Sequence, residues 1–359
     1  MGTHHATLGQ PIAPLKVGVP APQLAGSDPA RAALAAEAAG LDSMWWADRL
    51  AGWMPQGPHA LVDPLPAMAV AGHATSRLLV GTAVADVLRR HPAQLAQSAL
   101  TVQDLSGGRL VLGLGCGEAA GTVRYGMSFE RPVDRLVEAL EVLHALWRDG
   151  GPASFTGRHY SLSEARCGLA SAVTPPPIWL AGHGPRMLDI TGRTADGWLP
   201  TASGPSTYAN QLGTVRAAEA AAGRLPGSVE AGAFVWIVAA RDRSQARQLL
   251  ADERLRALGL LLPKGTLASS PLRQGPSLDL LGNEDMAGLA RQIDPDELAE
   301  VLPHGGPEDL AEDLARYRSA GAEHLVVCDM APLAGGEPGG SLRGLALYRW
   351  LRETLLVSS

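Results

Sequence analysis

The sequence lacks the features that mark membrane-spanning, secreted and nucleic-acid-binding proteins. It contains no apolar run of about 18 residues, the least that a membrane-spanning helix needs. Its 36 acidic residues outnumber its 30 Lys and Arg residues, and the basic residues form no stripe that would indicate a nucleic-acid partner. Residues 1–14 have neither the basic start nor the apolar stretch of a secretion signal, and we expect a disordered tail there.

Cysteine is scarce, which argues against a fold held by disulfides. Cys116, Cys167 and Cys328 lie far apart in the sequence and form no Cys-x-x-Cys pair. This pattern is typical of a reducing compartment and predicts a cytoplasmic protein without a metal centre. Hydrophobic residues make up 46% of the chain and charged residues only 18%, so we predict a folded protein with a large core.

Short apolar runs alternate with helical patterns along almost the whole chain. The strands are expected at 15–19, 42–47, 78–84, 109–114, 178–181, 197–199, 232–239 and 324–328, and the helices at 28–39, 64–74, 91–105, 131–148, 185–194, 206–222, 244–258, 307–320 and 342–356. This alternation predicts one (β/α)8 TIM barrel over residues 15–359. An open doubly wound sheet is the rival, but it usually has a glycine-rich turn after the first strand, where this chain has Pro20-Ala21-Pro22-Gln23.

Two segments interrupt the alternation. Residues 154–162 are expected to form a small hairpin before the fifth strand. Residues 259–303 are rich in Pro and Gly and have weak periodicity. We interpret them as an insertion that lies over a site.

Chemistry in such barrels is found at the carboxyl ends of the strands. After the fifth strand, Gly182 and Gly184 flank His183, and Pro185 begins a helix. Backbone N–H groups and the helix dipole can bind a phosphate there. A tight turn without a ligand explains the same residues about as well.

Two further strand ends carry candidate residues. The glycine-rich run 113–117 places Glu118 at the mouth of the barrel, although a lone Glu is more often a capping or salt-bridged surface residue. Trp45, Trp46 and Trp53 cluster after the second strand. They could form one wall around a planar cofactor, or they could be packing residues.

Taken together, five short segments resemble the coenzyme F420-dependent branch of the luciferase-like superfamily. These segments are 42–48, 90–97, 105–109, 115–119 and 181–188, and the resemblance covers roughly residues 15–200 well. Within this branch the chain looks most similar to the mycobacterial phthiodiolone ketoreductases, and next to the F420-dependent glucose-6-phosphate and hydroxymycolic acid dehydrogenases.

The resemblance implies a role for each of these segments. It places Asp48 against the deazaflavin ring, and a non-proline cis peptide at Ala83–Val84 behind the ring with Asp86 beside it. It assigns the cofactor phosphate to Gly182, His183 and Gly184. It also implies that Trp53 and Glu118 flank the carbon that accepts the hydride, and that the protein is a homodimer. The following list gives the implied site: Asp48, Trp53, Ala83, Val84, Asp86, Glu118, Gly182, His183, Gly184.

One departure from the family pattern concerns the mechanism. Many relatives have His directly after the strand-two Asp, as the base for a substrate hydroxyl, whereas this chain has Arg49. An arginine stays protonated and cannot act as an ordinary base, but it can donate hydrogen bonds to a carbonyl oxygen. We therefore predict a reductase in which Arg49 polarises the acceptor and Glu118 or a nearby His delivers the proton. Arg49 as a salt-bridged rim residue is the alternative.

A second departure concerns the substrate. Residues 201–205 lack the Lys that the sugar-phosphate dehydrogenases of this family carry there. We therefore expect an apolar small molecule, lipid-like or polyketide-like, in place of a phosphorylated sugar. Two other functions remain open: an FMN-dependent monooxygenase on the same barrel, and an accessory protein that has lost catalysis.

Overall fold

The structure is a computed structural model, and it describes residues 14–50, 60–148, 150–201, 204–273, 283–335 and 344–357. The predicted tail and Trp53 lie outside these ranges, apart from the first described residue, Pro14. Among the described helices, none is long and apolar enough to cross a membrane.

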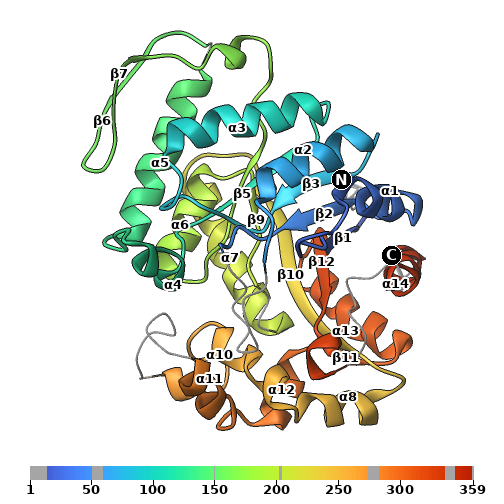
Figure 1. Ribbon diagram of the computed structural model, residues 1–359. Coiled ribbons are helices and arrows are strands. Elements are labelled where there is room, and N and C mark those ends of the chain that lie inside the picture. Colours follow the sequence, from blue (N-terminus) through green and yellow to red (C-terminus); the bar gives the residue numbers. More distant parts are fainter. Residues whose placement is uncertain are drawn as a thin grey trace, which may run out of the picture.

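Eight parallel strands close into a barrel. Figure 1 shows the strands at the centre of the molecule with helices around them. In order around the barrel they are β1 (Lys16–Pro20), β2 (Ser43–Trp46), β3 (Leu79–Thr82), β5 (Leu110–Gly115), β8 (Ile178–Leu180), β9 (Gly197–Trp198), β10 (Glu230–Ala239) and β12 (His324–Asp329). The ring is closed because β12 pairs with β1 and β10 pairs with β9. The predicted (β/α)8 TIM barrel is confirmed.

Helices surround the barrel, and their starts follow from local sequence. They are α1 (Pro29–Ala38), α2 (Pro64–Ala74), α3 (Pro92–Leu105), α5 (Pro132–Trp147), α6 (Pro185–Thr194), α7 (Pro205–Ala221), α8 (Arg243–Leu250), α13 (Pro307–Ser319) and α14 (Leu345–Val357). Asp28 and Asp63 accept backbone hydrogen bonds as N-caps of α1 and α2, each just before a proline. Proline suits this position because its missing N–H would have no partner in the first turn.

Two tryptophans fill the lumen of the barrel. Trp45 of β2 and Trp179 of β8 lie with their ring centroids 5.4 Å apart, and both are almost fully buried. Glycines on the neighbouring strands make room for them: a Cβ at Gly81 would lie 2.5 Å from the Trp45 ring, and one at Gly197 would lie 2.4 Å from the Trp179 ring. The barrel is therefore a packed core with no open pore.

Carboxylates brace the amino end of the barrel. Asp42, just before β2, accepts a hydrogen bond of 2.8 Å from the N–H of Val17 in β1. Asp196, just before β9, accepts one of 2.8 Å from the N–H of Ile178 in β8. Each acid thus satisfies a backbone donor where the strand pairing begins.

The structure corrects one predicted helix and adds several short elements. The single helix expected over 244–258 is α8 followed by α9 (Glu253–Arg256), because Asp252 accepts from the N–H of Arg254 and caps a new helix. The expected hairpin is β6 (Ala153–Thr156) with β7 (Ser161–Ala165). The unpredicted elements are β4 (Ala85–Asp86), α4 (Ala119–Thr122), η1 (Val123–Tyr125) and η2 (Gly168–Ser171).

The region interpreted as an insertion contains α10 (Leu258–Leu261), η3 (Pro271–Arg273), α11 (Asn283–Ala290) and α12 (Pro295–Val301), and is followed by β11 (His304–Gly305). These helices share a second hydrophobic core that includes Leu258, Ile293 and Leu298. That core packs against Val238 and Trp236 near the carboxyl end of β10 and against η5 (Ala331–Ala334). In Figure 1 they lie below the barrel, at the end toward which β10 runs.

Candidate active site

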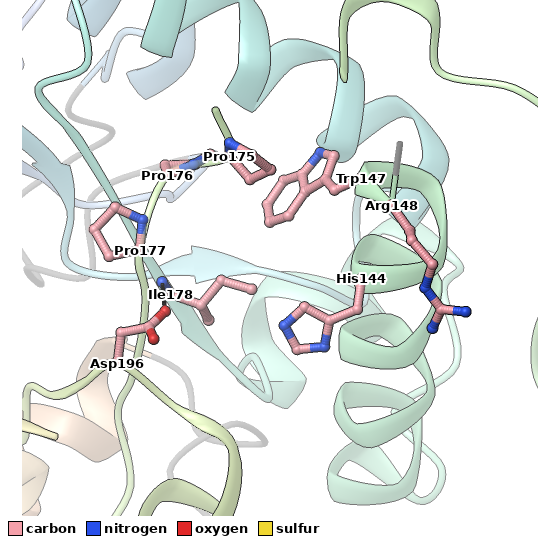
Figure 2. A pocket seen from close by; sticks show the side chains of 8 residues that line it. All are labelled: His144, Trp147, Arg148, Pro175, Pro176, Pro177, Ile178 and Asp196. Carbon is pink, nitrogen blue, oxygen red and sulfur yellow. Dashed lines mark hydrogen bonds between the residues drawn. The ribbon is translucent and has the colours of Figure 1, made fainter. Parts of the chain in front are cut away.

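A surface hollow lies at the end of the barrel opposite the predicted site. It has a volume of about 590 Å³. Figure 2 shows its lining, which consists of His144, Trp147, Arg148, Pro175, Pro176, Pro177, Ile178 and Asp196. Ile178 begins β8 and Asp196 precedes β9, so the hollow is at the amino ends of the strands. Barrel enzymes carry their chemistry at the other end, the carboxyl ends of the strands.

The peptide bond between Ala83 and Val84 is cis, as the resemblance predicted. It follows directly after β3, at the carboxyl end of the barrel. Ala83 packs against the lumen cluster that contains Trp45, and its N–H donates to the carbonyl of Trp46 at 2.7 Å. On the neighbouring strand, a Cβ at Gly115 would lie 2.6 Å from Val84 Cγ2. Glycine at that position therefore makes room for the turn at Ala83–Val84.

Asp48 is a buried carboxylate bound by two arginines. Its Oδ1 lies 2.7 Å from Nη2 of Arg89 and accepts a hydrogen bond of 3.1 Å from Nη2 of Arg90. Its Oδ2 accepts from the N–H of Asp86 at 3.1 Å and from Nε of Arg90 at 3.2 Å. Burial raises the pKa of Asp48, but the guanidinium groups of Arg90 and Arg89 hold it below its usual value. Asp48 thus joins the end of β2 to the segment after β3, and its contact with a cofactor ring stays a prediction.

Asp86 takes part in the same group. Its Oδ2 accepts from Nε of Arg89 at 3.0 Å, and its Oδ1 accepts from the N–H of Leu88 at 2.8 Å. Arg89 is almost fully buried between the two acids. A Cβ at Gly117 would lie 2.6 Å from Asp86 Oδ1, so the carboxylate packs tightly against the loop after β5.

Arg49 and Glu118 lie in contact. Nη2 of Arg49 donates to Oε1 of Glu118 at 2.6 Å, which joins the loop after β2 to the start of α4. The Glu118 side chain is 52% exposed and that of Arg49 is 30% exposed. Glu118 is the residue before α4 but makes no capping hydrogen bond with its side chain. The pair fits a shared site at the mouth, and a salt bridge at the rim is the alternative that the sequence left open.

The segment Gly182–Gly184 joins β8 to α6. Gly182 has φ +156°, and a Cβ there would lie 2.7 Å from Cβ of Met187. A Cβ at Gly184 would meet nothing within 4 Å, so the backbone before α6 faces open space. Such a helix start offers N–H groups that have no partner within the helix. The geometry therefore suits an anion, and binding itself stays a prediction.

His183 is held by a residue that sequence reasoning missed. Its Nδ1 lies 3.3 Å from Oε1 of Gln211, which comes from α7. Burial lowers the pKa of His183, and the bond to Gln211 raises it by less, so the ring is neutral at pH 7. A hydrogen bond from Nδ1–H to Gln211 leaves Nε2 free of a proton.

The family assignment rests on a match to most of the chain. The family model described as luciferase-like monooxygenase matches residues 15–324. The chain belongs to this family. The predicted resemblance is confirmed.

Two relatives illustrate what this luciferase-like chain is similar to. A phthiodiolone/phenolphthiodiolone dimycocerosates ketoreductase from Mycobacterium kansasii is 32% identical over 324 residues, which cover 82% of this chain and 88% of that protein. An F420-dependent hydroxymycolic acid dehydrogenase from Mycobacterium tuberculosis is 36% identical over 220 residues, 60% of each protein.

Solved structures share the fold. An F420-dependent secondary alcohol dehydrogenase, in complex with an F420–acetone adduct, has a TM-score of 0.74 at 23% identity and covers 88% of this chain and 93% of its own. The oxygenating constituent of 3,6-diketocamphane monooxygenase from Pseudomonas putida, in complex with FMN, has a TM-score of 0.66 at 17% identity. The match covers 93% of this chain and 96% of that chain. Since both cofactors occur on this fold, the fold alone does not decide between them.

The luciferase-like scaffold brings together most of the predicted site residues that the structure describes. Ala83, Val84 and Asp86 lie together after β3, beside Asp48. Arg89 and Arg90, which bind Asp48, were missed as site residues. The sequence does contain a signal for them, because Arg90 begins the segment 90–97 of the family resemblance and Arg89 directly precedes it, but neither was given a role. Trp53 lies outside the described residues.

Proposed function

We propose that this protein is an F420-dependent oxidoreductase that reduces an apolar carbonyl compound. The observation that carries the proposal is the contact of 2.6 Å between Arg49 and Glu118, at the barrel end that also bears the cis peptide Ala83–Val84. A permanent cation that can stabilise the developing charge on oxygen, beside a carboxyl group that can transfer a proton, suits the reduction of a carbonyl group. The similarity to a ketoreductase and to an F420-dependent dehydrogenase supports it.

The residues present fit a planar cofactor that carries a phosphate. Gly115 accommodates the side chain of Val84, and the ring would rest on the Ala83–Val84 turn. The open backbone at Gly184 and the start of α6 would hold the phosphate. When bound in its reduced form, the deazaflavin supplies a hydride.

Arg49 and Glu118 would act on the acceptor oxygen. When a carbonyl carbon gains a hydride, its oxygen gains negative charge and then a proton. Arg49 donates a hydrogen bond to that oxygen and stabilises the charge. Glu118 would deliver that proton from its protonated carboxyl group, through the oxygen that is not bonded to Arg49, and its exposed side chain would then be reprotonated from solvent.

The side chains near the mouth on the β10 and β12 side favour an apolar substrate. Gly232 of β10 faces the lumen, because a Cβ there would lie 2.7 Å from the ring of Trp179. By strand alternation Phe234 and Trp236 face the same way, and both are half-buried. Phe234 packs against the lumen cluster and Trp236 against the core of the insertion helices. This aromatic wall suits a hydrocarbon group beside the carbonyl.

The cofactor can be tested by titration with F420 and with FMN, with quenching of tryptophan fluorescence as the readout. We expect saturable F420 binding in the micromolar range, and FMN binding weaker by at least about tenfold, or 1.4 kcal/mol. Tighter binding of FMN, with consumption of oxygen on reduction, would favour the monooxygenase. Binding of neither would favour the accessory protein.

Affinity for F420 should rise as the pH falls below 7. The free His183 ring is neutral because burial lowers its pKa, whereas a bound phosphate anion would favour the protonated ring. The pKa of His183 is then higher in the complex than in the free protein. As the pH falls through the pKa of the complex, the affinity for F420 rises, by at most about tenfold per pH unit. Dissociation constants from pH 5 to 8 would measure this. His183→Asn, which cannot titrate, should give a flatter curve; parallel curves would refute the role of His183.

A further inference from the structure

A chain of hydrogen bonds runs through the amino end of the barrel and ends on Trp45. Lys16 donates to Glu230 at 2.9 Å, and Glu230 Oε1 lies 3.3 Å from Nδ1 of His324. Nε2 of His324 lies 2.7 Å from Oγ of Ser43, which accepts a bond of 2.7 Å from Nε1 of Trp45. These residues come from four different strands, β1, β10, β12 and β2. We call Glu230, His324 and Ser43 the relay.

Each polar group of the relay has a hydrogen-bonding partner on both sides. Ser43 Oγ accepts the bond from Trp45, and as a hydroxyl it still has a hydrogen and a second lone pair for its contact with Nε2 of His324. On the other side of the ring, Nδ1–H of His324 donates to the carboxylate of Glu230. Burial raises the pKa of Glu230, but the bonds from His324 and Lys16 hold it below its usual value, so it stays an acceptor. His324 and Ser43 are both fully buried, and water does not compete for these bonds.

Trp45 is also fixed by packing. Its ring lies against Gly81 of β3, where a Cβ would come within 2.5 Å, and its Nε1 lies 3.0 Å from where a Cβ on Gly18 would be. The His324 ring meets it edge-on, with centroids 5.7 Å apart. A rotation of the indole is therefore opposed from both sides as well as by Ser43.

Trp45 in turn supports the candidate cofactor site. Ala83, the first residue of the cis pair, packs against the lumen cluster of Trp45 and its neighbours. A shift of the indole would therefore move the surface on which the cofactor ring would rest. Displacements of about 1 Å at such a surface can change a rate by about 100-fold.

We propose that Ser43 and His324 are positioning residues for hydride transfer. Through Trp45, the relay fixes the position of the Ala83–Val84 turn relative to the cofactor ring. This inference rests on the proposed function, because it needs a cofactor ring at that turn. The relay would thus have a role in the reaction although it lies at the opposite end of the barrel.

The first experiment reads the relay without any cofactor. The protein is labelled with ¹⁵N in the tryptophan indoles, and the Trp45 signal is identified by its loss in Trp45→Phe. In the wild type this N–H should exchange slowly with solvent. In Ser43→Ala the Trp45 indole signal should shift, and its N–H should exchange faster with solvent, because the hydrogen-bond acceptor Oγ is gone. An unchanged signal would overturn the relay.

The second experiment measures the effect on the site. In Ser43→Ala the rate constant for hydride transfer from reduced F420, in a single turnover, should fall by about 10- to 100-fold. The KM for the carbonyl substrate should change by less than about twofold, because the relay does not touch the substrate. His324→Phe, which keeps the ring between the two tryptophans, should act in the same direction and serves if Ser43→Ala does not fold. Glu230→Gln should lie closer to the wild type than Glu230→Ala.

The matched control is Asp196→Asn. It weakens a partly buried hydrogen bond to Ile178 at the same end of the barrel, away from the relay, so it should lower stability and leave the hydride-transfer rate unchanged. If Ser43→Ala loses stability like this control, with a hydride-transfer rate within twofold of the wild type, the relay is only structural and the proposal fails. If the wild type itself binds no F420, the proposed function fails instead, and the indole signal still reports on the relay.

Discussion

Replacing Asp48 by alanine should lower the free energy of unfolding by about 3–5 kcal/mol. The carboxylate is almost fully buried and ion-paired with Arg89, which is buried as deeply, and with Arg90. Without it, Arg89 keeps only Asp86 as an ion-pair partner, and the contacts that join the end of β2 to the segment after β3 are lost. Chemical denaturation of the wild type and the variant measures the loss.

Asp189→Ala is the matched control, because it removes a carboxylate from an exposed ion pair with Arg193. That variant should unfold close to the wild-type midpoint. A loss in Asp48→Ala no larger than in this control would show that the buried group contributes little.

The contribution of Asp48 to stability should depend on pH. The pKa of Asp48 is lowered in the folded state, so its stabilising contribution is complete above the usual pKa of an aspartate. It is lost as the pH falls through the lowered pKa. The difference in stability between wild type and Asp48→Ala should therefore shrink below about pH 4.

Glu118→Gln should reduce turnover with F420 and a carbonyl substrate by about 10²- to 10⁴-fold. The amide keeps an oxygen that can accept the hydrogen bond from Arg49, so the loop geometry is retained, but it cannot transfer a proton. The dissociation constant of F420 should stay within about twofold, because the phosphate contacts are unchanged. Steady-state kinetics and binding titrations give the two quantities separately.

Two comparisons sharpen this test. Glu130→Gln changes an exposed acid that is not part of the pair, and it should leave turnover unchanged. Arg49→Ala should lower turnover as well, because the acceptor oxygen loses its donor. Full turnover in Arg49→Ala would identify the Arg49–Glu118 contact as a rim salt bridge.

The barrel itself was predictable because its signals are local. The helix over 64–74 was predicted with the bounds that the structure has, since Asp63 and Pro64 mark its start within the sequence. The run at 109–114 identified a strand covered on both faces. The helix expected over 244–258 failed because a capping aspartate, Asp252, restarts a helix within an otherwise continuous pattern.

The candidate site was predictable only in part. Gly182–Gly184 and the cis peptide were identified through a family resemblance and short motifs. The sequence did not identify three further residues of the site: Arg89, Arg90 and Gln211. Their roles depend on which side chain each one contacts, Asp48 for the two arginines and His183 for the glutamine. No spacing along the chain indicates that Nδ1 of His183 lies beside a residue of α7.

What the sequence by itself determined is the order of strands and helices, and with it the closed barrel, because hydrophobic periodicity and caps act within a few residues. What only the tertiary structure decided is which side chains meet. Arg49 and Glu118 are 69 positions apart, and Ser43 and His324 are 281 positions apart. Barrel closure brings such residues within hydrogen-bonding distance, and the register of neighbouring strands determines which of them pair.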